Sequence, residues 1–299
     1  MKINDIVIFK DIHYQQSKKK IKNDYPPISA KIEIAKDVFI EKIDEDLSTE
    51  IFLNCTPKGS IDEAADQRQL YSFVRENAPT QPFFKWDKDE NLQICIALSR
   101  LIQPTTISFE YSARVVYLNG RVHEIIPGPV SNFGAHAWVA TQESRNWLTE
   151  IEGEELSELF IKYKNSNLPK RIRQASWYLE YIFRSYHLDI RWPLLCTALE
   201  SLIHTDKYRS TIQFSKRVSK LANEVGIHNF DETKAEQAYD YRSILVHGKL
   251  LRDLKHYDAE LYIGMEEILR KVLKLSIISN SFAKVFSSEA SIKKRWPIK

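Results

Sequence analysis

The sequence predicts an α+β domain over residues 1–149, followed by an all-α antiparallel helical bundle over residues 150–299. The length of 299 residues suits two domains of roughly 150 residues each. The first half mixes short β-branched runs with helical segments, whereas helical apolar spacing begins near Thr149 and then continues. The charge changes at the same place: residues 1–150 give 18 − 21 = −3, and residues 151–299 give 25 − 19 = +6.

The composition is that of a folded globular protein, with 28% charged and 43% hydrophobic residues. The eight glycines and eleven prolines are too few for a fibrous or low-complexity chain. No apolar run approaches the roughly 20 residues of a membrane span, and the first residues do not resemble a secretory leader. Cys55, Cys95 and Cys196 are too far apart for a zinc or redox motif. We therefore expect a cytoplasmic protein with no membrane association, metal or cofactor.

In the first half, two short runs rich in β-branched residues, 32–34 and 38–40, predict strands. Residues 115–118 and 121–126 predict a hairpin, because Asn119-Gly120 between them suits the positive φ angles of a two-residue turn.

Two helices are expected between these strands. The capping box Ser60-Ile61-Asp62-Glu63 predicts a helix that reaches about Asn77, and a second helix is expected from Asn91 to about Gln103. The lysine run 18–20 with Lys22 is most simply a solvated loop. No glycine-rich phosphate-binding loop is present in this half.

The second half predicts successive amphipathic helices with short connections, the pattern of an antiparallel bundle. The first carries Leu156, Leu159, Phe160 and Tyr163, and a loop follows it. The others are expected over 170–187, from a cap at Asp189 through Ile203, over 211–225 with a stop at Gly226, from after Asp231 to a stop at Gly248, and over 257–286.

The fifth of these helices ends in the segment 240–249, Asp-Tyr-Arg-Ser-Ile-Leu-Val-His-Gly-Lys. Arg242 and His247 in it have the spacing R-x-x-x-x-H. The segment resembles the signature of HEPN domains and, more narrowly, of the Apea-like HEPN branch. The upstream stretch 192–202, with Ala198-Leu199-Glu200, is similar to the "ALE" helix of that family. The resemblance covers about residues 165–285.

The resemblance implies metal-independent RNA cleavage by a homodimer, with Arg242 and His247 as catalytic residues. The ribose 2′-hydroxyl would attack the adjacent phosphorus, leaving 2′,3′-cyclic phosphate and 5′-hydroxyl ends. Histidine is suited to move protons near neutral pH, and arginine to face phosphoryl charge. The family context further implies a defence or toxin-like role, in which the first domain or a regulatory partner protein restrains the nuclease.

Geometry restricts how this pair can act. Residues five apart on a straight helix point about 140° away from each other. Gly248 could allow the imidazole of His247 to swing round at the helix end. A two-fold dimer, which the resemblance implies, would instead supply Arg242 and His247 from both copies.

Other residues near the motif are candidates for supporting roles. Glu200 is expected to orient Arg242, with Ser243 and Asp240 as further polar neighbours. Active family members commonly carry Asn, Asp or His where this chain has Ser243. Four residues close to the motif in sequence are expected to contact RNA phosphates: Lys249, Arg252, His204 and His256.

Two alternatives stay open. In one, Arg242 only pairs with Asp240 or Glu236, and His247 only caps carbonyls at the helix end. In the other, the bundle is a non-catalytic HEPN module that binds RNA or a nucleotide, or that serves dimerisation. The aromatic residues of the second helix, Trp177, Tyr178, Tyr181 and Tyr186, are expected mainly in the core, although exposed ones could stack a base.

Overall fold

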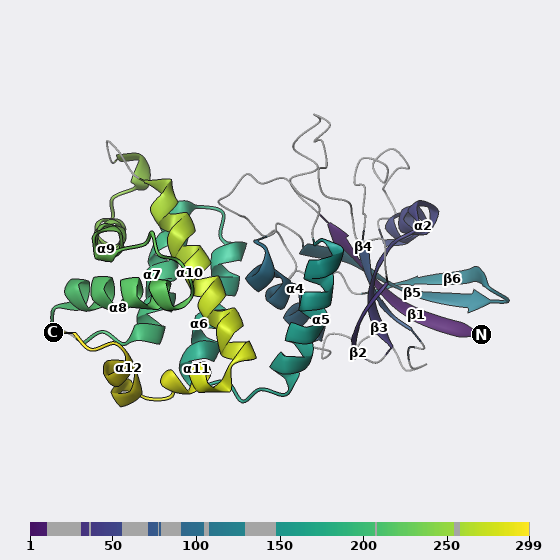
Figure 1. The fold of residues 1–299 in the computed structure, drawn as a ribbon. Coiled ribbons are helices and arrows are strands. Elements are labelled where there is room, and N and C mark those ends of the chain that lie inside the picture. The colour runs from purple at the N-terminus through teal and green to yellow at the C-terminus, as the bar shows by residue number, and fades with distance from the viewer. Residues whose placement is uncertain are drawn as a thin grey trace. The chain divides into compact units, whose positions relative to one another are not determined.

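The computed structural model describes residues 1–10, 31–35, 37–55, 71–76, 78, 91–104, 108–128, 148–206, 208–253 and 258–298. The described chain forms two compact units, one ending at Ile161 and the other beginning at Lys162 (Figure 1). The first unit contains a sheet with helices and the second is helical, so the expected order of an α+β part and a helical part is confirmed. The predicted lysine-rich loop at 18–22 lies outside the described residues.

The described residues of the first unit form a six-stranded antiparallel sheet in the order β2-β3-β4-β1-β5-β6. The strands are β1 (Lys2–Lys10), β2 (Ile32–Ala35), β3 (Val38–Lys42), β4 (Tyr71–Arg75), β5 (Ser108–Leu118) and β6 (Arg121–Pro127). The predicted strands at 32–34 and 38–40 are confirmed as β2 and β3. The predicted hairpin is β5–β6, with φ of 53° at Asn119 and 78° at Gly120, as a two-residue turn of this type requires.

The prediction of a helix reaching Asn77 is wrong over β4, which is a strand. Its aromatic and β-branched residues suit a pleated surface, and β4 pairs with both β1 and β3. The pairing of β4 with a strand on each side therefore decides the conformation of residues 71–75. The capping box at 60–63 lies outside the described residues.

Helices cover the sheet. Helix α2 (Glu45–Cys55) places Ile51 in a core with Ile6, Ile8 and Val115 on one face. The opposite face buries an ion pair in which Arg114 donates to both carboxylate oxygens of Asp5, at 2.8 and 3.1 Å. Helix α4 (Asn91–Ile102) confirms the helix expected from Asn91.

Helix α5 (Glu150–Lys164) was expected to open the bundle, but most of its length belongs to the first unit. Its Ser157 hydroxyl donates to the Glu33 carbonyl of β2 at 2.8 Å, and Leu156 and Leu159 are buried. The division between the units therefore falls about one helix later than residue 149.

The second unit is built from α6 (Lys170–Arg184), α7 (Leu188–Ile203), α8 (Ser210–Glu224), α9 (Glu232–Val246), a short 3-10 helix (Leu251–Asp253), α10 (Ala259–Ile278), α11 (Asn280–Val285) and α12 (Glu289–Arg295). Helix α6 packs on α7, α8 packs on α9, and α10 contacts all four. Arg171 near the start of α6 donates to the Ser201 carbonyl near the end of α7 at 2.8 Å, so these two helices are antiparallel. No helix in the described ranges is long and apolar enough to cross a membrane.

Two sequence-based boundaries are corrected. Helix α7 begins before Asp189, whose carboxylate instead accepts a hydrogen bond of 2.6 Å from the Leu251 amide. The helix expected over 257–286 is interrupted at Ser279, where the backbone is extended and the hydroxyl accepts from the Phe282 amide at 3.3 Å. A serine that caps a new helix competes with continuation of the old one.

Candidate functional site

Helix α9 has defined caps at both of its ends. The Asp231 side chain accepts a hydrogen bond of 2.9 Å from the Lys234 amide at its start. At its end the Gly248 amide donates to Leu245 at 3.0 Å and the Lys249 amide to Ile244 at 3.3 Å. With φ of +88° at Gly248, this is a Schellman motif. The stop expected at Gly248 is confirmed, and it fixes the backbone on both sides of His247.

The structure brings Arg242 and Glu200 together. Arg242 Nη2 on α9 lies 3.5 Å from Glu200 Oε2 on α7. The Tyr239 hydroxyl, one turn before Arg242, donates to Glu200 Oε1 at 2.7 Å. The guanidinium also lies 5.3 Å from the centre of the Tyr239 ring. Arg242 therefore pairs with Glu200, and not with Asp240 or Glu236, both of which are exposed.

Partial burial shapes the electrostatics of this cluster. The side chains of Arg242 and Glu200 are 29% and 17% exposed. Burial and the hydrogen bond to Glu200 raise the pKa of Tyr239, so its hydroxyl remains a donor at neutral pH. Arg242 Nε is buried and has no hydrogen-bond partner among the described residues. The cluster holds a cation of fixed direction that solvent still reaches.

His247 lies apart from this cluster on the same helix. It is exposed, and its backbone remains near-helical, with φ of −88° and ψ of 15°. Its amide donates to the Ser243 carbonyl at 3.2 Å, so its side-chain direction continues that of α9. The backbone at His247 does not supply the turn that could swing the imidazole, because the chain turns only at Gly248. Within one chain Arg242 and His247 remain about 140° apart around the helix.

Most of the other predicted site residues lie on α9 or just after its end. Asp240 is exposed on the side of the helix away from Arg242, and Ser243 is half-buried. Lys249 and Arg252 are exposed after the helix end, and Arg252 Nε is 3.9 Å from the neighbouring Asp253. His256 lies outside the described residues.

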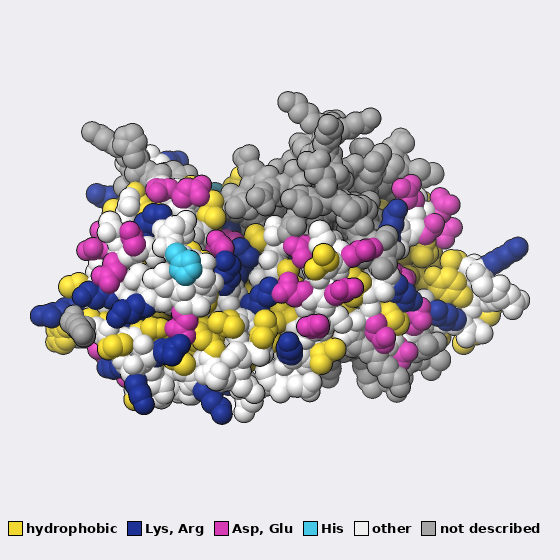
Figure 2. Space-filling view, in the orientation of Figure 1, with side chains coloured by type: hydrophobic (Ala, Val, Ile, Leu, Met, Phe, Trp, Pro, Cys, Tyr) yellow, Lys and Arg dark blue, Asp and Glu magenta, His cyan; other side chains and the backbone are white. Residues whose placement is uncertain are grey.

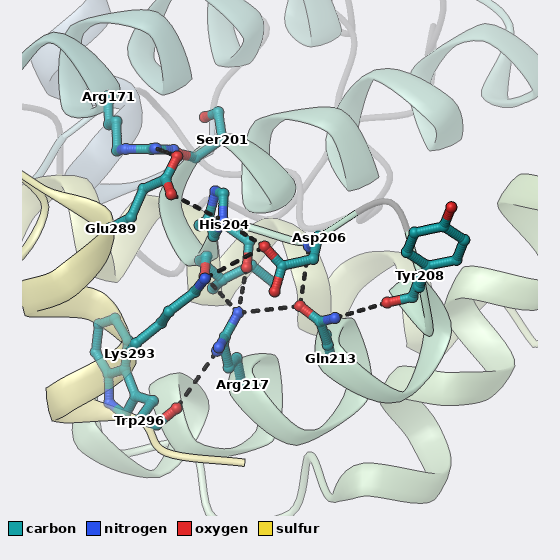
Figure 3. Close-up of polar contacts among 11 residues, drawn as sticks. Arg171, Ser201, His204, Asp206, Tyr208, Gln213, Arg217, Glu289, Lys293 and Trp296 are labelled. Atoms are coloured by element: carbon teal, nitrogen blue, oxygen red, sulfur yellow. Dashed lines mark hydrogen bonds and ion pairs between the residues drawn. The ribbon is translucent and has the colours of Figure 1, made fainter.

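His204, also expected to contact RNA, belongs to a different polar network at the end of α7 (Figure 3). Its Nε2 lies 3.0 Å from Asp206 Oδ1 and 3.3 Å from Glu289 Oε2 on α12. Lys293 Nζ lies 3.3 Å from the same Asp206 oxygen, and hydrogen bonds from His204 and Lys293 lower the pKa of Asp206. The imidazole is thus held by two carboxylates.

Arg217 of α8 also belongs to this network. Its guanidinium donates hydrogen bonds to three backbone carbonyls: that of His204, that of Ile203 at 3.4 Å and that of Trp296 at 3.3 Å. The network therefore ties α7, α8 and α12 together, which is a structural role, and His204 does not join Lys249 and Arg252 in one surface.

Tyr239 is the site residue that sequence reasoning missed. Its position three residues before Arg242 places both side chains on one helix face, so the spacing could have identified it. The partnership of His204 with Glu289, 85 positions later, has no comparable signal in the sequence.

The helical unit is basic overall, but its charge is unevenly placed. Residues 161–299 give 25 − 15 = +10. On the face shown in Figure 2, Lys and Arg side chains gather around α8 and α12, whereas acidic ones gather around α9. The acids of that helix and its cap are Asp231, Glu232, Glu236 and Asp240. A phosphate chain would be attracted more strongly by the surfaces outside α9.

No protein-family model, curated protein or solved structure matches the chain. In the part of the chain that the structure describes, no three His, Cys, Asp or Glu side chains are grouped as metal ligands, and the three cysteines are free.

Proposed function

We propose that the protein is a metal-independent endoribonuclease of HEPN type that acts in the cytoplasm as a defence or toxin-like effector. The observation that carries the proposal is the arrangement at the end of α9. Glu200 and Tyr239 hold Arg242 in place, and His247 is exposed five residues later at a glycine-terminated helix end. Two motif segments 42 positions apart thus meet in one structure.

Each side chain has a definite part in the proposed reaction. The ribose 2′-hydroxyl gives up its proton to water or to an imidazole as its oxygen bonds to phosphorus. The bond to the 5′-oxygen breaks, and the leaving oxygen takes up a proton. His247 transfers a proton in this step, since imidazole exchanges protons near neutral pH. Arg242 stabilises the charge on the phosphoryl oxygens. Glu200 and Tyr239 are positioning residues, because they act through Arg242.

A second copy of the chain completes the site. Since His247 points away from Arg242 within one chain, a two-fold pair would bring the His247 of one copy toward the Arg242 of the other. Val246, directly before His247, is 56% exposed, so a contact between copies at this helix end would bury it.

The test is a cleavage assay on end-labelled RNA in the presence of a chelator. The proposal predicts products with 2′,3′-cyclic phosphate and 5′-hydroxyl ends whose rate is unaffected by the chelator. Products that require added magnesium, or that carry 3′-hydroxyl ends, would contradict it. Gel filtration on the same sample is expected to give the mass of a dimer.

A second candidate function is a non-catalytic module that binds RNA or a nucleotide. The separation of Arg242 and His247 within one chain favours it, as does Ser243 next to the arginine. This function predicts RNA binding without products, with an affinity that falls steeply as salt rises. The same labelled RNA therefore distinguishes the two functions.

A further inference from the structure

Helix α6 exposes aromatic side chains on the face opposite its core. Trp177 is 69% exposed and Tyr181, one turn later, is 52% exposed, whereas Ile172, Ala175 and Leu179 face the core. The expectation that the aromatic residues of this helix lie mainly in the core is therefore wrong for these two. It is also wrong for Tyr186, which is 61% exposed, whereas Tyr178 is half-buried.

Cations lie in line with these two rings. Arg173 is exposed one turn before Trp177, and Arg184 is exposed three residues after Tyr181. Glu180 of the same helix is half-buried, and its carboxylate lies 3.9 Å from Arg184 Nη2. The spacings of three and four residues place Arg173, Trp177, Tyr181 and Arg184 along one side of α6. We call these four residues the α6 stripe.

The two rings are available to a ligand. Their centres are 6.4 Å apart and their planes are inclined by 34°, so they do not cover each other as stacked rings would. Each ring therefore keeps surface on which a base could stack.

We propose that the α6 stripe binds a single-stranded RNA segment, with bases stacked on Trp177 and Tyr181 and phosphates at Arg173 and Arg184. The choice of RNA as ligand rests on the proposed function, and the stripe lies outside the Arg242–His247 site. Sequence-tolerant single-strand binding combines aromatic platforms with cations that follow the backbone, which is the composition of this face. The surplus of positive charge in residues 161–299, +10 from 25 − 15, favours a polyanion.

The charge of the stripe and of its surroundings suits a polyanion. Both rings lie between arginines, and none of the four stripe residues is acidic. The neighbouring exposed side chains, Lys170 and Gln174, are polar. The start of α6 also contacts α12 through Arg171 and Glu289 at 3.6 Å, and α12 carries further lysines at its other end.

The test is the anisotropy of a fluorescein-labelled, unstructured RNA of about 12 nucleotides, with the same strand in a duplex as the comparison. All proteins carry His247→Ala so that cutting does not interfere. Trp177→Ala is expected to weaken single-strand binding at least about fivefold, and the double variant with Tyr181→Ala further, since each stacked base contributes about 5- to 150-fold. Trp177→Phe should restore most of the affinity. Tyr208→Ala removes another exposed ring, at 79% exposure, and should change nothing.

The proposal is overturned if Trp177→Ala and Tyr181→Ala leave single-strand affinity unchanged, or if duplex binding falls by the same factor. A shift from dimer to monomer at unchanged RNA affinity would assign the stripe to a protein contact and also overturn it. Failure of the nuclease proposal is distinguishable, because stripe-dependent binding by a parent protein that never cuts RNA contradicts only the catalytic function.

Discussion

Glu200 on α7 and Arg242 on α9 are 42 positions apart in sequence and lie 3.5 Å apart in the structure. The hydroxyl of Tyr239 completes the contact at 2.7 Å from the other carboxylate oxygen. The two segments that resemble HEPN motifs are therefore joined by a direct ion pair, in which the acid fixes the direction of the arginine.

Replacement of this acid tests its positioning role. Glu200→Gln is expected to lower the RNA cleavage rate about tenfold or more, because small misplacements of catalytic groups are costly, while the affinity for RNA changes little. Glu224→Gln is the matched control. Glu224 is 19% exposed and pairs with Arg295 and with the Trp296 indole at 2.9 Å, neither of which belongs to the Arg242 cluster. Equal loss of cleavage in both variants would show only a general structural effect.

Gly248, whose backbone is left-handed at the end of α9, provides a test of how the helix end affects stability and cleavage. Gly248→Ala is expected to lower the free energy of unfolding by about 1 kcal/mol, because φ is +88° and a Cβ atom there is strained. The added atom meets nothing within 4 Å, so the cost is confined to the backbone. Gly226→Ala, at φ of +79° with equal space, should destabilise the protein similarly in urea unfolding. Only Gly248→Ala should also slow RNA cleavage, since it adjoins His247.

The polar network at the end of α7 predicts that the stability of the fold depends on pH in the acidic range. Hydrogen bonds from His204 and Lys293 hold the pKa of Asp206 below its usual 3.8. A carboxylate whose pKa is lowered on folding stabilises the folded state above the unfolded pKa and loses that contribution as the pH falls through the folded value. The parent should therefore melt at a higher temperature than Asp206→Asn at pH 6, and the difference should narrow as the pH falls below 3.8. A difference that persists or grows in acid would contradict this assignment.

A buried charge cluster in the bundle predicts a larger loss of stability. Arg191 Nη2 lies 3.3 Å from Glu266 Oε2, and Arg270 Nε lies 3.9 Å from Glu266 Oε1. Glu266→Ala leaves the buried Arg191 and the partly buried Arg270 without their carboxylate, and removal of one partner from such a group costs about 3–5 kcal/mol. Glu267→Ala removes the adjacent acid, whose pair with Lys271 is exposed, and should change the free energy of unfolding by under about 0.5 kcal/mol. Equal effects in denaturant unfolding would refute the claim.

Local signals in the sequence were sufficient where the backbone conformation depends on a few neighbouring residues. Asn119-Gly120 set the hairpin, Gly226 and Gly248 ended their helices, and Asp231 began α9. These features need particular φ angles or caps that few residue types provide. Strand β4 could not be found in this way, because its conformation depends on pairing with strands far away in sequence.

The candidate site was predictable to a similar degree. Arg242 followed from the resemblance of the segment 240–249 to the HEPN signature, and Glu200 from the resemblance of its helix to the "ALE" helix. Their contact shows that the two segments meet. The direction of His247 did not follow, because it depends on whether the chain turns at His247 or one residue later at Gly248. The engagement of His204 by Glu289 depends on packing of α12 against α7, which no local pattern encodes.

The proposed catalytic role of His247 is tested by the rate at which His247→Ala cleaves single-stranded RNA in chelator, compared with the parent and with His228→Ala. His228 is another exposed histidine, with Nδ1 3.2 Å from Asn223. Removal of a general acid–base group typically lowers the rate by about 10²–10⁴-fold, and His247→Ala is expected to show such a loss with unchanged folding and dimer mass. His228→Ala should cleave at the parental rate. Cleavage by His247→Ala at the parental rate would show that His247 is not catalytic.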